Sequence, residues 1–95
     1  MAHHDLKLFT KYFQPVVDGK KRSEVRFNDR RFQIDDTVTL HEGQPSINGF
    51  EYTGRTVSAS ISYIDDFGLN DGYVNLSLRD VGLLIVMDDK NESSN

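Results

Sequence analysis

The sequence predicts a small α+β domain that is mainly β, in which five or six short strands form a strongly curved sheet or barrel with one flanking helix. Three observations indicate this fold class. The chain has 95 residues, which is enough for one domain. Polar and apolar residues alternate in several short runs, as is typical of strands with one buried face. Apolar residues at helical spacing occur in a single segment, which follows Thr10.

The first two elements are a strand and a short helix. Residues 4–8 alternate and predict the first strand. Helical spacing over residues 10–18 predicts the helix, with Thr10 as its cap. We expect Pro15 near the start of the regular helix, because proline has no backbone N–H to donate. Gly19 supplies the left-handed residue that follows the last turn.

The next segment concentrates the positive charge of an acidic protein. Residues 20–31 contain six of the eleven Lys and Arg residues and carry a net charge of +4, whereas the whole chain carries −4. Residues 24–28 alternate as a strand, and we expect Val25 and Phe27 to face the core. The opposite face of this strand then carries Glu24, Arg26 and Asn28.

The rest of the chain predicts further strands at residues 37–41, 56–64 and 73–79. Residues 42–55 contain glycine and proline and predict a loop, with or without a short hairpin. The apolar segment Val81–Met87 predicts an added edge strand. Residues 88–95 lack large apolar side chains, so the domain is expected to span residues 1–87 with a flexible acidic tail over 88–95. The side chains expected to be largely buried are Tyr12, Phe13, Val16, Val25, Phe27, Val38, Leu40, Ile61, Val74 and Leu76.

The composition excludes several classes of site. The chain has no cysteine, which rules out disulfides, thiolate nucleophiles and cysteine-based zinc sites. The spacing of His3, His4 and His41 matches no zinc site, so we expect no metal and no cofactor. No signal peptide pattern and no apolar run of bilayer length is present, and we expect a cytoplasmic protein without membrane contact.

The segment after the predicted helix matches the motif Gly-x-Lys-x-x-Glu-x-Arg through Gly19, Lys21, Glu24 and Arg26. With its flanking segments, the chain resembles the ASCH domains of the PUA-like superfamily, and more narrowly a small ASCH-like family of phages and bacteria whose function is unsettled. The flanking segments are His4–Lys7, Tyr12–Phe13, Asn28–Arg30 with Phe32, Tyr52–Arg55, Gly68–Leu69 and Gly72–Val74. The resemblance implies a small β-barrel with a cleft beside the motif strand, and a link to RNA. It also implies a phage or prophage origin. Some relatives in the wider group are nucleoside amidohydrolases or ribonucleases.

The leading functional hypothesis is a domain that binds RNA or a nucleotide in the motif cleft. Lysine and arginine side chains supply phosphate contacts, and an exposed tyrosine supplies a stacking surface for a base. Glu24 can accept from a base amino group or orient an arginine, or it can form a structural ion pair with Arg26. The candidate ligand-binding residues are Lys20, Lys21, Glu24, Arg26, Asn28, Arg30, Arg31 and Tyr52.

Two alternatives from other classes remain open. The chain could be a small hydrolase that acts on a modified nucleoside, in which a neutral Lys21 serves as the base and Glu24 orients water. Only under this alternative do these two residues become catalytic. The chain could instead be a phage module that binds a protein partner through its acidic body.

Overall fold

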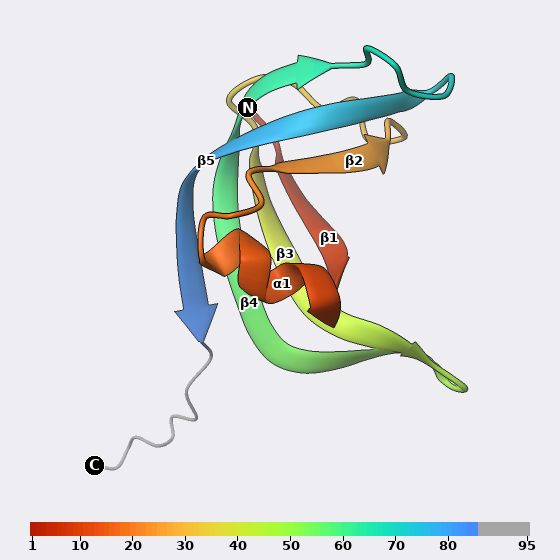
Figure 1. The fold of residues 1–95 in the computed structure, drawn as a ribbon, viewed down its shortest axis with the longest axis vertical. Helices are drawn as coiled ribbons and strands as arrows, with labels where there is room; N and C mark the ends of the chain where they lie inside the picture. Colours follow the sequence, from red (N-terminus) through yellow and green to blue (C-terminus); the bar gives the residue numbers. More distant parts are fainter. Residues whose placement is uncertain (86–95) are drawn as a thin grey trace.

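The computed structural model describes residues 1–85, which form one helix and five strands (Figure 1). In chain order these are β1 (His3–Phe9), α1 (Thr10–Val17), β2 (Ser23–Phe27), β3 (Thr37–Ser46), β4 (Gly49–Asp65) and β5 (Tyr73–Ile85). The protein is therefore mainly β with one short helix, as the sequence predicted. The predicted tail, and the last two residues of the apolar segment Val81–Met87, lie outside the described residues.

The strands form one mixed sheet in the order β1-β3-β4-β5-β2. β1 pairs in parallel with β3, and the other three pairs are antiparallel. β4 is long, its pairing with β5 is interrupted by two register shifts, and it bends through the molecule so that α1 lies across the concave side of the sheet (Figure 1). β1 and β2 are the two edges, and within residues 1–85 they are not paired with each other. The hydrogen-bonded sheet is therefore open between them.

The structure differs from the strand prediction in two places. Residues 42–55 form the ends of β3 and β4, which meet in a hairpin where Ser46 pairs with Gly49. The glycines of this segment are accommodated by a register shift between His41 and Gly43 and by positive φ angles, of Gly49 at the turn and of Gly54 within β4. Likewise, the two predicted C-terminal strands are one strand, β5, which pairs with β4 and is not at an edge. Asp80, with φ of 55°, lies within β5, at the position between the two strands that we predicted.

The helix differs from its prediction at its start. The N-cap residue is Phe9, and the Thr10 hydroxyl donates to the Gly43 carbonyl at 3.4 Å and caps no helical amide. Pro15 lies inside the helix and not near its start. Pro15 has no N–H to donate to the Lys11 carbonyl, so the helix lacks one bond there, while the Pro15 carbonyl accepts the amides of Lys20 and Lys21 just beyond the helix end. Gly19 has φ of 76°, which confirms its predicted left-handed conformation.

The core lies between α1 and the concave face of the sheet. Of the predicted core residues, those that are fully buried are Phe13, Val16, Val38, Leu40, Ile61 and Leu76, and Val74 is half-buried against them. The prediction was wrong for Tyr12, Val25 and Phe27, which are 39%, 50% and 54% exposed. The prediction divided the side chains of β2 correctly between two faces but placed the wrong face toward the core. Glu24 points inward because two cations meet it there, and Phe27 packs on the outside against Tyr73, with the rings edge to face at 5.3 Å.

Candidate ligand-binding groove between the sheet edges

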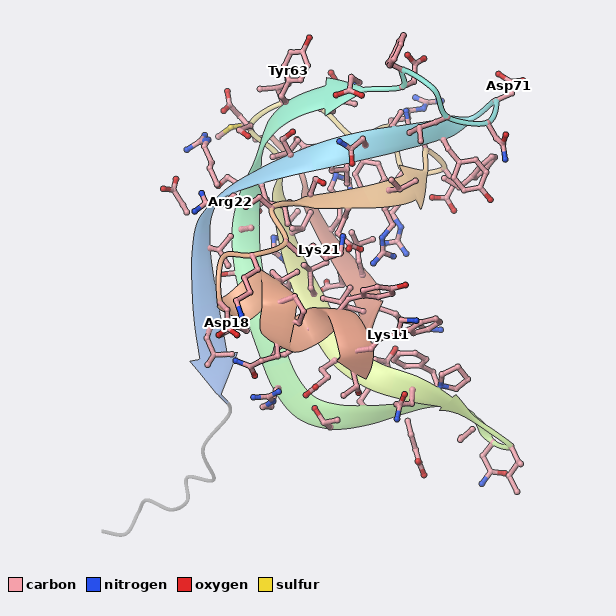
Figure 2. All side chains as sticks on the ribbon, in the orientation of Figure 1. Lys11, Asp18, Lys21, Arg22, Tyr63 and Asp71 are labelled. Carbon is pink, nitrogen blue, oxygen red and sulfur yellow. The ribbon has the colours of Figure 1, made fainter. Side chains whose placement is uncertain are left out.

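The motif residues converge on Glu24, whose side chain is only 8% exposed. Lys21 Nζ lies 2.8 Å from Glu24 Oε1, and Arg26 Nη2 lies 3.1 Å from Oε2. Lys21 can reach the carboxylate because it lies in the connection between α1 and β2, outside the alternation of the strand (Figure 2). Its ammonium also donates to the Ser23 carbonyl. The two oxygens of Glu24 are thus each matched by a cation.

Two arginines bridge the gap between the sheet edges. Arg26, on β2, donates to the carbonyl of Lys7, and Arg30 donates through Nη1 to the carbonyl of Asp5 at 3.0 Å. These carbonyls are two residues apart on β1, along the side that no strand covers. The arginines therefore make contacts that a neighbouring strand would otherwise supply. Each guanidinium has five N–H donors, so these contacts leave others available to a ligand.

A hollow of about 730 Å³ lies along this gap. Its lining residues, which define what we call the edge groove, are Asp5, Leu6, Lys7, Arg26, Arg30, His41 and Tyr52. Two smaller hollows adjoin it along β2, of about 300 Å³ toward α1 and about 170 Å³ toward the turn after β2. Arg26 lines all three hollows, which makes it the residue common to the whole gap.

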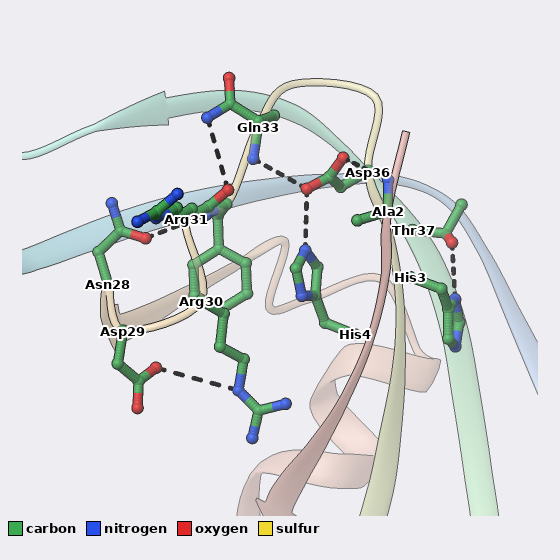
Figure 3. Close-up of polar contacts among 11 residues, drawn as sticks. Ala2, His3, His4, Asn28, Asp29, Arg30, Arg31, Gln33, Asp36 and Thr37 are labelled. Carbon is green, nitrogen blue, oxygen red and sulfur yellow. Dashed lines mark hydrogen bonds and ion pairs between the residues drawn. The ribbon is translucent and has the colours of Figure 1, made fainter.

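The turn that follows β2 positions Arg30 beside β1. Asn28 Oδ1 accepts the Phe32 amide at 3.0 Å, and Arg31 takes a left-handed conformation with φ of 53° (Figure 3). Phe32 is buried and packs edge-on against the His4 ring at 4.7 Å. Asn28 therefore shapes the turn, and its side-chain oxygen is occupied by the backbone.

Aromatic rings continue the groove onto the β3–β4 hairpin. Tyr52 is 56% exposed, as expected, although it lies on β4 and not in a loop. Its ring meets the Phe50 ring at 5.0 Å and the His41 ring at 6.1 Å, both edge to face. Phe50 also stacks with Phe9 at 6.2 Å, and Lys7 Nζ lies 5.2 Å from the centre of the Phe50 ring. We call Phe9, Phe50 and Tyr52 the aromatic ledge.

The eight candidate ligand-binding residues fall into distinct groups. Those that line the edge groove are Arg26, Arg30 and Tyr52. Glu24 pairs with both Lys21 and Arg26 and lines the smaller hollow toward α1, while Asn28 holds the turn. Lys20 and Arg31 are exposed and line none of the three hollows.

Sequence reasoning missed three polar groove residues, Asp5, Lys7 and His41. They meet because β1 and β3 are parallel, with Lys7 opposite His41, and this pairing has no local sequence signal. Asp5 Oδ1 lies 2.9 Å from His41 Nε2. The hydrogen bond with His41 is the main cause that lowers the pKa of Asp5, and the charges of His3, His41 and Arg30 add to it.

Other buried polar groups are satisfied within the fold. Asp36, 2% exposed, accepts from the Ala2 amide, the Gln33 amide and His4 Nε2 at 2.8–3.0 Å (Figure 3). The bonds from Ala2 and His4 are the largest causes that lower the pKa of Asp36 to about 2. Glu42 is held by Arg55 in a two-point contact of 2.9 and 3.2 Å. These clusters fix strands to one another and do not face the edge groove.

Residues 1–85 contain neither a cluster of metal-ligating side chains nor a helix that could cross a membrane. No group of three or more metal-ligating side chains in this part of the chain is placed to hold a metal ion. No helix among the same residues has the length and apolar character needed to span a bilayer.

Comparison with known proteins gives two matches. The model of a family described as a domain of unknown function (DUF3850) matches residues 3–78. A curated protein of Escherichia phage P2, described as an uncharacterized 12.9 kDa protein in the GpA 3′ region, is 43% identical over 63 residues. The match covers 66% of this chain and 54% of the phage protein, so the chain spans about half the length of the curated relative it matches.

Proposed function

We propose that this chain, which belongs to the DUF3850 family of domains of unknown function, binds single-stranded RNA or a nucleotide in the edge groove. The observation that carries the proposal is the grouping of Lys7, Arg26 and Arg30 in one hollow that ends at an exposed tyrosine. The chain carries a net charge of −4, so this grouping is not a general feature of its surface.

The cations suit a phosphate backbone. Arg26 and Arg30 are already oriented by carbonyls of β1 and, for Arg26, by Glu24, so little side-chain freedom is lost when a phosphate binds. Their remaining N–H groups supply the paired donors that phosphate oxygens accept. Lys7, on the neighbouring strand, adds a third charge.

The aromatic ledge suits the bases of an unpaired strand. Stacking on an aromatic ring contributes about 1–3 kcal/mol per base in single-strand binding proteins. A duplex keeps its bases stacked and closed to such a surface, which favours a single strand or a single nucleotide as the ligand.

Kinship with the ASCH domains of the PUA-like superfamily is part of this proposal. The convergence of Lys21 and Arg26 on Glu24 supports it, since these are the residues that carry the resemblance. We also propose that this sheet is a β-barrel of that type which is not fully closed, in which Arg26 and Arg30 span the gap between β1 and β2. A phage-related, cytoplasmic role belongs to the same proposal and is supported by the similarity to the phage P2 protein.

The hydrolase alternative is less well supported by the geometry. Glu24 is 7% exposed and each of its oxygens is paired with a cation, so a water molecule would have to displace Lys21 or Arg26 to reach it. The carboxylate is arranged to hold the arginine and not to activate water.

The proposal is tested by titrating a short single-stranded RNA of mixed sequence at several salt concentrations. Three phosphate contacts predict that the logarithm of the affinity falls with the logarithm of the salt concentration at a slope of about −2. Arg30→Gln should weaken binding and flatten this slope by about 0.7. The matched control is Arg22→Gln, since Arg22 belongs to the same basic segment but bonds back to the Gly19 carbonyl at 3.0 Å and lines none of the hollows.

The outcomes separate the three classes of function. Absence of RNA and nucleotide binding at low salt would overturn the proposal. Turnover of a modified nucleoside that is abolished by Glu24→Gln would favour the hydrolase. A defined protein partner that is retained by both Arg30→Gln and Arg26→Lys would favour the interaction module.

A further inference from the structure

The edge groove contains a carboxylate that phosphate binding does not explain. Asp5 lines the same hollow as Lys7, Arg26 and Arg30, and its side chain is 67% exposed. A negative charge at this place opposes the approach of a phosphate. A groove that served phosphates only would bind them better without Asp5, and a carboxylate at this place suits a ligand group that donates hydrogen bonds.

Asp5 is held as an acceptor of hydrogen bonds. Its Oδ1 lies 2.9 Å from His41 Nε2, and this contact lowers the pKa of the carboxyl, which keeps it ionised at neutral pH. An ionised carboxylate only accepts, and its two oxygens offer about four lone-pair sites, of which His41 occupies one. The remaining sites can receive two N–H groups that lie side by side.

Donors and an aromatic face adjoin this acceptor. Arg30 Nη1 donates to the Asp5 carbonyl at 3.0 Å, which places its guanidinium along the same stretch of β1. Tyr52 contacts the His41 ring at 6.1 Å and is more than half exposed. One hollow therefore combines an acceptor pair, a fork of donors and a ring on which a flat ligand can stack.

We propose that the Asp5 end of the edge groove recognises a guanine base. Asp5 accepts from the N1–H and the exocyclic amino group of guanine, Arg30 donates to its O6, and Tyr52 stacks on its ring. This inference rests on the proposed function and specifies which base that site prefers.

The other bases fit this arrangement less well. Adenine and cytosine each offer one amino group beside a ring nitrogen that is itself an acceptor, and this acceptor would face the carboxylate. Uracil offers one N–H between two carbonyls, which would also face the carboxylate. Guanine alone presents two adjacent donors followed by an acceptor, which matches a carboxylate beside a guanidinium.

The test measures affinity for a set of short RNAs that differ at one central base within an adenine background. The central base is guanine, inosine, adenine, cytosine or uracil, where inosine keeps N1–H and O6 but lacks the amino group. We expect guanine to bind roughly 10-fold more tightly than adenine, with inosine between them, since one good two-point contact discriminates by this order.

The variant Asp5→Asn should reduce the guanine-to-adenine ratio to about 2-fold or less, because an amide offers one donor and one acceptor in place of two acceptors. The matched control is Asp29→Asn, which removes an exposed carboxylate 3.9 Å from Arg30 but outside the edge groove. Both variants should raise the affinity for the RNAs without guanine through charge, and only Asp5→Asn should change the guanine-to-adenine ratio. Asp5→Glu, which keeps the charge but moves the oxygens, should lower the ratio without that general gain.

A wild-type ratio near one, with RNA still bound, would overturn the guanine inference and leave the proposed function standing. Equal ratios in Asp5→Asn and Asp29→Asn would also overturn it, since charge would then explain both. If no RNA of the set binds, both proposals fall.

Discussion

Glu24 is a buried carboxylate on which two cations, Lys21 and Arg26, depend for their ion pairs. Glu24→Gln removes the negative charge and leaves Lys21 and Arg26 facing a neutral amide that can accept only at one atom. We expect the free energy of unfolding to fall by about 2–3 kcal/mol, because a buried charge pair loses one member. Urea denaturation measures this loss. Glu51→Gln, at an exposed position, is the control and should change the value by less than about 0.5 kcal/mol. Equal losses in both variants would contradict a central role for Glu24.

The sequence predicted which residues of the motif come together but not which way they face. Alternation over residues 24–28 divides the side chains between two faces and contains no signal for which face is inside. Hydrophobicity favoured Val25 and Phe27, yet Lys21, from the preceding connection, makes the inward position of Glu24 favourable. The outcome depends on an ion pair that forms only after the helix and strand are placed.

The β3–β4 hairpin depends on Gly43. A Cβ atom at this position would lie 2.3 Å from Cε2 of Phe50 and 2.4 Å from the Glu51 carbonyl oxygen, so both of these groups, or the backbone of residue 43, would have to move. We expect Gly43→Ala to lower the free energy of unfolding by about 1–3 kcal/mol through this overpacking, and to displace the Phe50 ring from Phe9. Chemical denaturation measures the first effect. The control is Gly82→Ala, where the nearest atom would be Ser58 Oγ at an ordinary 3.8 Å. A smaller loss for Gly43→Ala than for the control would contradict the packing argument.

Most elements were predictable and their ends were not. Alternation located β1, β2 and parts of the other three strands, because each has a buried face. The glycines and proline of residues 42–55 favoured a loop, but cross-strand pairing of Phe50 and Tyr52 with β3 overrides that local preference. Pairing between strands cannot be predicted from the propensities of the residues within one short segment.

At the scale of the whole molecule, three carboxyls tie strands together and have lowered pKa values: Asp5, Asp36 and Glu42. In the unfolded chain these groups bind protons at higher pH than in the folded protein, so stability rises with pH while they titrate. We expect their contribution to be complete above about pH 4.5 and to be lost as the pH falls through the folded values toward about 2, the folded pKa of Asp36. Unfolding free energies measured from pH 2 to pH 7 test this.

The variant Asp36→Asn sharpens the pH test. The amide cannot titrate, so the increase in stability between pH 2 and pH 4 should become shallower, while the protein at neutral pH should be less stable because His4 and the Ala2 amide lose a charged acceptor. A pH profile as steep as that of the wild type would show that these bonds do not lower the pKa of Asp36.

The position of β2 in the sheet has a consequence for the order in which the chain can fold. β2 is the second strand in sequence, yet its only hydrogen-bonded neighbour among residues 1–85 is β5, the last. Likewise, β1 has no partner strand until β3 has been synthesised. On a ribosome that adds about 5–20 residues per second, β2 remains unpaired for seconds after its synthesis. Apart from the contacts of Arg26 and Arg30 with β1, the two sides of the edge groove, β1 and β2, are connected through the strands β3, β4 and β5 that lie between them. Because β2 is held in the sheet by β5, the groove between β1 and β2 is the last part of the molecule to assemble. We expect a nascent chain to lack the complete binding site until β5 has left the ribosome.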